Sequence, residues 1–241
     1  MRRWVAVIAL VQVFYAARAR NIIGAFAIKG GYALELRLRS RARASRDVDM
    51  VLEPNRDQLA DAVVEALRET WSEFTFGVKS GPEYREHSIR FEINARYRDR
   101  EWSTFVLEVV EGEITEEDIV APLDLQEFGL LRAESIPCIN MSVQVAQKLH
   151  AVTDPSEDRA RDLLDIFIII STFECDDGAI KAAIVDVFNE RKTHAWPTPI
   201  EMRDGWATQI LETIKRDGFD FTLDQVLRGV RAFVLRLVGT D

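Results

Sequence analysis

The feature that most constrains this chain is a pair of aspartates, Asp47 and Asp49, separated by fifteen residues from a preceding Gly-Gly dipeptide. Residues 47–52 alternate polar and apolar side chains, which predicts a half-buried strand. Residues two apart in a strand project from the same face, so both carboxylates enter one volume. Two carboxylates at such a short distance repel each other unless a cation lies between them. The pair therefore predicts a site for Mg²⁺ or Mn²⁺, which hard oxygen ligands suit.

A strand, a turn and a short helix are predicted before this pair. Residues 25–28 form the expected strand, Lys29-Gly30-Gly31 ends it, and residues 32–38 carry helix formers at the right period. The glycines let the backbone approach a triphosphate with N–H groups directed at it. This order of elements meets the needs of metal-assisted nucleotidyl transfer, in which one metal organises the triphosphate and a second activates the acceptor hydroxyl.

A third carboxylate, Glu108, alternates with apolar residues in the strand expected at residues 104–110. One interpretation places it beside Asp49 on the neighbouring strand, as a further metal ligand. The other leaves it as an acid on a solvent-exposed face, where acidic residues are common.

A second group of charged residues belongs to predicted helices. Lys148 stands on an otherwise apolar helix, while Arg159, Asp162 and Asp165 are spaced three apart near one helix face. The lysine suits neutralisation of phosphate charge, with Asp165 holding it in place or deprotonating the acceptor. The alternative is a structural ion pair between helices, because ion pairs outnumber active sites. His150 has no partner at a metal-ligand spacing, which predicts an ordinary packed or exposed histidine.

The whole pattern predicts an α+β (mixed α/β) chain. Beyond the elements above, a first helix is expected at residues 3–19, a helix at 58–70, strands at 74–78 and 88–97, and an exposed acidic connection after Glu111. Helices are expected at residues 142–152, 157–173, 178–189, 200–215 and 222–238. We place two domains at residues 1–122 and 123–241, with a ligand cleft between them.

The net charge of −9 excludes a generic nucleic-acid binder, but the charge is uneven. Residues 20–50 hold seven basic residues against three acids, and residues 111–127 hold seven acids and no base. The basic stretch suits a polyphosphate or an RNA backbone, or is only a solvated loop. Its crowded arginines are Arg37, Arg39, Arg41, Arg43 and Arg46.

The N-terminal segment resembles a signal peptide, with Arg2-Arg3, the apolar run Trp4–Leu10 and a cleavage-like Ala17–Ala19. The run is short, is followed by Gln12, and cannot span a bilayer. We expect instead a buried amphipathic helix and a cytoplasmic protein without membrane contact. The two cysteines show neither a disulfide framework nor a zinc spacing, which fits a reducing compartment.

Four blocks together resemble the AbiEii/AbiGii-type nucleotidyltransferase toxins, and among them the MenT toxins of MenAT toxin–antitoxin systems. The resemblance covers most of the chain from Trp4 onward and is specific because the blocks occur together. They are Lys29–Gly31 with Leu34–Arg37, Ser45–Asp49, Gln147–His150 and Asp158–Asp165, and the likeness extends to Phe188–Arg191 and His194–Pro197.

The resemblance implies a DNA polymerase β-like nucleotidyltransferase fold with a mainly helical C-terminal half. The residues it implies are Asp47 and Asp49 for metal binding and catalysis, Lys148 and Asp165 for catalysis, Lys29, Gly30 and Gly31 for the nucleotide, and Arg159 and Asp162 for pocket support. Ser45 stands beside the metal site, where phosphorylation would inactivate by like-charge repulsion. Tyr32 follows the glycines where many members have Ser or Thr.

The resemblance further implies an enzyme that adds nucleotides, often pyrimidines, from nucleoside triphosphates to the 3′ acceptor end of tRNA and so blocks translation. A cognate antitoxin is the implied partner, and we expect a monomer. Two alternatives stay open. The same enzyme acts on a protein hydroxyl or a small molecule, which the net charge of −9 supports. Otherwise the chain is a non-catalytic RNA- or partner-binding module, against which the uncompensated carboxylate pair argues.

Overall fold

The computed structural model describes residues 2–45, 47–53, 59–114, 117–126, 129–156 and 158–239, without the side chain of Ser40. Arg46 of the basic stretch lies outside this range, as do several residues of the acidic segment and the expected first residues of two helices, Gln58 and Glu157. The chain divides into two compact units. Unit 1 comprises Met1–Arg37 and Ser45–Ile139, and unit 2 comprises Leu38–Ala44 and Asn140–Asp241. Unit 1 thus continues past residue 122, where the sequence suggested a boundary.

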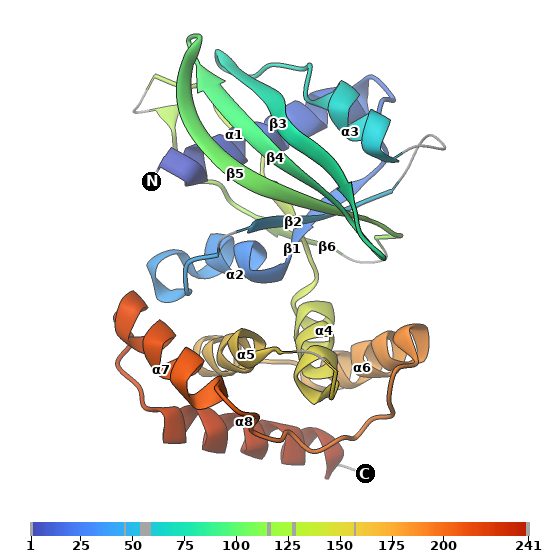
Figure 1. Cartoon of the computed structure of the whole chain (residues 1–241), viewed down its shortest axis with the longest axis vertical. Helices are drawn as coiled ribbons and strands as arrows, with labels where there is room; N and C mark the ends of the chain where they lie inside the picture. The colour runs from blue at the N-terminus through green and yellow to red at the C-terminus, as the bar shows by residue number, and fades with distance from the viewer. Residues whose placement is uncertain are drawn as a thin grey trace. The chain divides into compact units, whose positions relative to one another are not determined.

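Unit 1 is built on a mixed sheet, seven-stranded in the described part of the chain, with the order β3-β4-β5-β2-β1-β7-β6. β2 runs parallel to β5 and β1 runs parallel to β7, whereas the other neighbouring pairs are antiparallel. The strands are β1 (Phe26–Lys29), β2 (Asp47–Leu52), β3 (Phe74–Tyr84), β4 (Ile89–Tyr97), β5 (Arg100–Glu111), β6 (Glu117–Val120) and β7 (Ile136–Ile139), as Figure 1 largely labels them.

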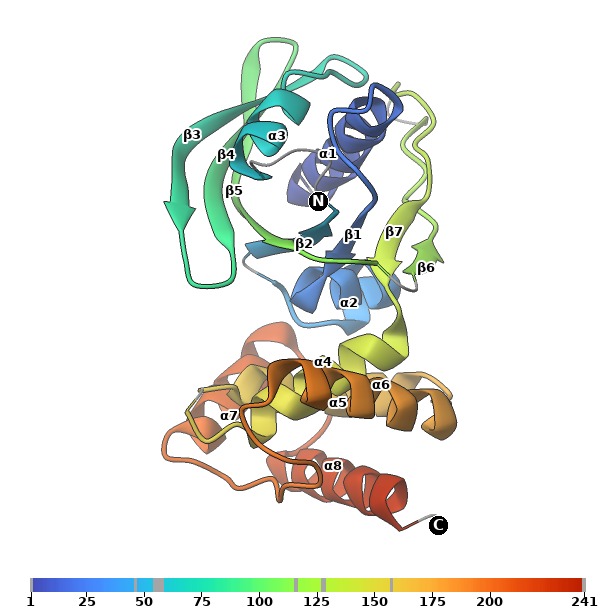
Figure 2. The same ribbon diagram turned by 90° about the vertical axis from the view of Figure 1, so that its right-hand side faces the viewer.

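One face of this sheet carries the core of unit 1. Helices α1 (Arg2–Ala19) and α3 (Leu59–Ala66) lie together on that face, as Figure 2 shows. Val48 and Met50 of β2 are fully buried in the same core. Because side chains alternate along a strand, Asp47 and Asp49 point to the opposite face. The expected half-buried strand at residues 47–52 is confirmed with the same bounds.

The first helix is correctly predicted, but its amphipathic character is wrong. Every residue from Val5 to Phe14 is buried, so α1 lies inside unit 1 on nearly all sides. Gln12 is tolerated there because its amide satisfies the backbone of Glu134, donating to the carbonyl at 3.1 Å and accepting from the N–H at 2.7 Å. In the part of the chain that the structure describes, no helix has the length and apolar character needed to cross a membrane.

The acidic segment after Glu111 was expected to be only an exposed connection, which is wrong for its central part. Glu117–Val120 forms the edge strand β6, which pairs antiparallel with β7. Its alternate side chains are exposed, so the segment carries little hydrophobic signal in the sequence. Arg37 of helix α2 (Gly30–Leu38) contacts Asp118 at 2.9 Å and the Ile139 carbonyl at 2.5 Å. A basic residue therefore adds to the backbone pairing with β7 and to the packing of Val120 in holding the edge strand.

Unit 2 is helical, which agrees with the expected C-terminal half. Its helices are α4 (Met141–Thr153), α5 (Ala160–Thr172), α6 (Asp177–Arg191), α7 (Trp206–Asp217) and α8 (Leu223–Val238), with the short 3-10 helix η1 (Arg39–Arg41). α5 packs against α4, α7 and α8. Helix α7 begins later than the expected residue 200, because Gly205 precedes it with a positive φ of 81° that a helix does not admit.

Candidate functional site

Three carboxylates gather on the face of the unit 1 sheet opposite α1. Asp49 of β2 and Glu108 of β5 are register partners in the parallel pair, and Asp47 lies two residues before Asp49. Register partners point to the same side of a sheet, as do residues two apart in one strand. This confirms the interpretation that Glu108 stands beside Asp49, while its function as a metal ligand stays a prediction. The side chains of Asp47 and Glu108 are 35% and 24% exposed, so solvent and ligands reach them.

Arg90 of β4 lies among these carboxylates. Its register partner is Glu108, and its guanidinium stands 3.5 Å from Asp47 Oδ1 and 3.8 Å from Glu108 Oε2. Ser88 Oγ donates to Glu108 Oε1 at 2.7 Å, and Arg85 is 3.9 Å from the other oxygen. Reasoning from the sequence missed Arg90, because only the β4–β5 register brings it to this face.

Gly30 has a defined reason to be glycine. Its φ is +65°, and a Cβ at this position would lie 2.0 Å from Asp49 Oδ2. The antiparallel β1–β2 register brings Lys29 opposite Asp49, so the aspartate carboxylate lies over the start of α2. Gly30 therefore admits the Asp49 carboxylate. Its further role in phosphate approach, like those of Lys29 and Gly31, stays a prediction.

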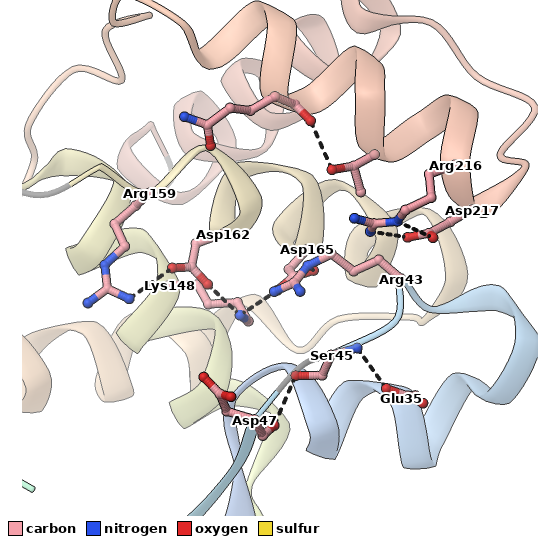
Figure 3. Close-up of polar contacts among 12 residues, drawn as sticks. Glu35, Arg43, Ser45, Asp47, Lys148, Arg159, Asp162, Asp165, Arg216 and Asp217 are labelled. Carbon is pink, nitrogen blue, oxygen red and sulfur yellow. Dashed lines mark hydrogen bonds and ion pairs between the residues drawn. The ribbon is translucent and has the colours of Figure 1, made fainter. Parts of the chain in front are cut away.

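A buried carboxylate holds the segment before β2. Glu35 of α2 accepts hydrogen bonds from Trp4 Nε1 at 2.5 Å, Arg3 at 3.4 Å and the Ser45 backbone N–H at 2.8 Å. Ser45 Oγ donates to the Asp47 carbonyl at 3.1 Å, as Figure 3 shows. Ser45 is buried, so the predicted phosphorylation requires this contact to open. Ser45, two residues before Asp47, is thus held by contacts to both α2 and β2.

Tyr32, which follows the glycines, does not present its hydroxyl to solvent. Its side chain is fully buried in the unit 1 core, where burial raises the pKa of the phenol. The Arg3 guanidinium lies 5.6 Å from the ring centroid. Tyr32 is therefore a core residue.

The charged residues of α4 and α5 form a buried network within unit 2. Lys148 Nζ donates to Asp162 Oδ1 at 2.6 Å and to Asp165 Oδ2 at 2.7 Å (Figure 3). Arg43 donates to both oxygens of Asp165, at 2.7 and 2.8 Å, in the bidentate geometry that makes such pairs strong. Arg159 lies 3.8 Å from Asp162 and its side chain is 48% exposed. Asp165 is completely buried, so two cations balance its charge away from water.

The network keeps its charges at neutral pH. Burial alone would lower the pKa of Lys148, but the charges of Asp162 and Asp165 outweigh it and raise that pKa. Burial would likewise raise the pKa of Asp165, but Arg43 and Lys148 lower it. A carboxylate that accepts from two cations is a weak base, because general bases work best with a pKa near the working pH. Asp165 is thus better suited to positioning Lys148 than to accepting a proton from the acceptor.

The basic stretch is only partly a free surface. Arg43 is buried against Asp165, and Arg37 is bonded to Asp118 and Ile139, whereas Arg39 and Arg41 are exposed. For Arg43, the interpretation as a solvated loop residue is wrong. The sequence offers no local signal for this, because Asp165 is distant along the chain.

A second group able to hold a metal occurs in unit 2. Ligand atoms of His150, Asp154 and His194 lie within 4.8 Å of one another, so the sequence spacing wrongly suggested that His150 has no metal-type neighbour. However, Arg191 lies 3.3 Å from His150 Nδ1. Its guanidinium can only donate, and its positive charge opposes a divalent cation. Thr193 Oγ also lies 3.1 Å from His150 Nε2. These contacts favour a hydrogen-bonded cluster, and the carboxylate face of unit 1 offers the better donor set for a hard cation.

Comparisons with known proteins identify the family and the fold of this chain. The model of the family "Nucleotidyl transferase AbiEii toxin, Type IV TA system" matches residues 16–234. MenT4, a nucleotidyltransferase toxin from Mycobacterium tuberculosis, is 17% identical with a TM-score of 0.54, covering 99% of this chain and 98% of its own. JHP933 from Helicobacter pylori is 14% identical with a TM-score of 0.50, covering 94% and 89%. These likenesses show a shared nucleotidyltransferase fold. A search of curated protein sequences gives no match.

Proposed function

Because the chain belongs to the AbiEii nucleotidyl transferase toxin family, we propose that it is a metal-dependent toxin that transfers a nucleotide, preferably a pyrimidine, from a nucleoside triphosphate to the 3′ end of tRNA. The acceptor hydroxyl oxygen bonds to the α-phosphorus, and pyrophosphate leaves. Loss of a free acceptor end blocks translation. The observation that carries the proposal is the shared face of Asp47, Asp49 and Glu108, with the Asp49 carboxylate lying over Gly30.

The carboxylate face would hold the cation. Asp47 and Asp49, with Glu108 beside them, are hard oxygen donors on one exposed face, which fits Mg²⁺ or Mn²⁺. When bound, the cation organises the triphosphate and makes the acceptor hydroxyl easier to deprotonate. Gly30 and Gly31 start α2 and direct backbone N–H groups toward phosphate oxygens, as helix N-termini do. Lys29, the last residue of β1, adds a positive charge there.

The cations of unit 2 supply charge for the transfer. We assign Lys148 to stabilising the negative charge that develops on the transferred phosphoryl group. Asp165 and Asp162 position its ammonium by accepting hydrogen bonds at 2.7 and 2.6 Å. Arg159, which is half exposed beside Asp162, adds a second positive charge. A cognate antitoxin and tRNA are the proposed partners of a monomer that acts in the cytoplasm.

A second candidate keeps the enzyme and changes the acceptor to a protein hydroxyl or a small molecule. The net charge of −9 favours it, because a polyanionic RNA is repelled by an acidic protein. Two arginines of the basic stretch, Arg37 and Arg43, are also engaged in internal contacts. This candidate shares the carboxylate face and differs only in what receives the nucleotide.

Labelled nucleoside triphosphates incubated with the protein and total tRNA test the proposal. Wild type should label tRNA in a Mg²⁺-dependent manner, and Asp47→Ala should reduce labelling by about a hundred-fold or more, because an essential charge-stabilising group is lost. Asp61→Ala, which removes an exposed acid from α3, is the matched control and should label normally. Label in a protein band and never in RNA selects the second candidate.

Expression in cells gives a separate readout of toxicity. Induced wild type should arrest growth, and Asp47→Ala should not. Equal arrest by both variants refutes the catalytic toxin and leaves the non-catalytic binding module. Both proteins need matched expression and circular dichroism spectra, so that loss of folding is not mistaken for loss of chemistry.

A further inference from the structure

We propose that Arg90 is a built-in counter-cation of the carboxylate face, which neutralises Asp47 and Glu108 without metal and competes with a divalent cation for them. The inference rests on the proposed function, because it takes these carboxylates as metal ligands. It makes Arg90 a positioning residue that sets the metal affinity of the free enzyme.

The guanidinium of Arg90 lies near carboxylates from two different strands. Arg90 NH2 lies 3.5 Å from Asp47 Oδ1 on β2, and its NH1 lies 3.8 Å from Glu108 Oε2 on β5. β5 is the strand between β4 and β2, so Arg90 reaches across it to contact Asp47. The rigid fork of an arginine can address two acids at once, which a single ammonium point charge does less well.

The two Arg90 contacts are close enough to neutralise the carboxylate charges and weak enough for a divalent cation to displace the guanidinium. Both distances exceed the length of a hydrogen bond, so each is an ion pair without a fixed donor geometry. The Arg90 side chain is 26% exposed, and ion pairs that solvent reaches are weak. Without such a cation, clustered carboxylates repel one another. A divalent cation therefore meets an ordered face on which a weakly held positive charge has to be displaced.

Glu108 has contacts of its own that do not depend on Arg90. Ser88 Oγ donates to Glu108 Oε1 at 2.7 Å, and Arg85 stands 3.9 Å from Oε2. Arg85 is shared between Glu108 and Glu83, to which it donates at 3.0 Å, whereas Arg90 contacts both Asp47 and Glu108. Removal of Arg90 should therefore raise the negative potential between Asp47 and Glu108, while Arg85 stays beside Glu108.

Mn²⁺ titration followed by electron paramagnetic resonance, without nucleotide, tests the inference. Arg90→Gln should lower the Mn²⁺ dissociation constant by about three- to ten-fold, because a competing charge is removed from a partly exposed site. Arg90→Lys keeps the charge and should lie closer to wild type. Arg96→Gln is the matched control, because Arg96 lies exposed on the same strand and donates to the Asp99 carbonyl. It should bind Mn²⁺ as wild type does.

The outcomes separate this inference from the proposed function. Equal or weaker Mn²⁺ binding by Arg90→Gln overturns the counter-cation, provided that its urea midpoint matches wild type. Asp47→Asn with Asp49→Asn should weaken Mn²⁺ binding in the same assay. If that double variant binds like wild type, the metal site itself fails. If the double variant binds Mn²⁺ weakly and Arg90→Gln binds it no more tightly than wild type, only the inference about Arg90 fails. Added salt should shrink the difference between wild type and Arg90→Gln, because exposed charges are screened.

Discussion

At the scale of single residues, the tightest steric constraint on the carboxylate face is the space beside Gly30. Two separate constraints require a glycine at this position. The φ of +65° is costly for residues with a Cβ, and the volume of that Cβ is taken by the Asp49 carboxylate. Asp49, which is proposed to bind metal, can therefore occupy its position because Gly30 has no side chain.

Gly30→Ala should displace Asp49 and weaken metal binding by about ten- to a hundred-fold, the size seen when groups that orient a ligand are lost. Mn²⁺ titration measures this directly. Gly129→Ala is a matched control in the same unit, because Gly129 also has a positive φ, +75°, but no atom within 4 Å of an added Cβ. Both variants carry a backbone cost of about 1–2 kcal/mol. Equal metal affinity in both would show that Gly30 does not place Asp49.

At the scale of elements, the end of α4 depends on one carboxylate. Asp154 is the C-cap residue, and its Oδ1 accepts from the Ser156 backbone N–H at 2.9 Å and hydroxyl at 2.6 Å. His194 contacts its other oxygen at 3.8 Å. The Ser156 hydroxyl bond contributes most to lowering the pKa of Asp154 to about 2, with smaller contributions from the Ser156 N–H, Thr193 and His194. The α4–α5 connection is thus stabilised by an ionised side chain.

This pKa predicts acid sensitivity. The folded-state pKa lies below the unfolded value of 3.8, so the stabilisation is complete above about pH 4 and is lost as pH falls toward 2. The contribution is about 2 kcal/mol, from 1.36 kcal/mol per pKa unit. Urea unfolding between pH 6 and pH 2.5 should show the advantage of wild type over Asp154→Asn shrinking below pH 4. Asp186→Asn, at an exposed position of α6, should show no such change. A constant difference at all pH values would contradict the assignment.

At the scale of the whole molecule, the chain passes between its two compact units more than once. Residues 38–44 belong to unit 2, although the strands β1 and β2 on either side of them belong to unit 1. Arg43 in this segment forms the bidentate pair with the buried Asp165. Unit 2 therefore relies on a residue from the N-terminal part of the sequence to balance a charge in its interior.

Arg43→Ala should destabilise unit 2 by about 3–5 kcal/mol, because removing one partner leaves a buried charge uncompensated. Hydrogen–deuterium exchange should rise in α4 and α5 and stay unchanged in β4 and β5 of unit 1. Arg41→Ala, two residues away and exposed, is the control and should leave exchange unchanged throughout. Faster exchange confined to unit 1 would refute the assignment of this segment to unit 2.

Local sequence patterns were enough to predict many of the secondary-structure elements and the family of this protein. The alternation at residues 47–52 determined a strand with Asp47 and Asp49 on one face, and the period of helix formers located α4, α5, α6 and α8. The motif blocks were sufficient for the family, which the match over residues 16–234 confirms. These features depend on residues close together in the chain, where backbone geometry and side-chain periodicity act directly.

Only the tertiary structure decided which distant residues meet. The β4–β5 and β2–β5 registers bring Arg90 between Asp47 and Glu108, and Arg43 pairs with Asp165. The cluster of His150 with Asp154 and His194 likewise depends on a fold contact between a helix and a later loop. Such contacts depend on sheet register and on packing between elements, which no local periodicity encodes. The sequence by itself therefore determined Asp47 and Asp49 as the pair on one strand face, and the fold added Glu108 and the charges that surround them.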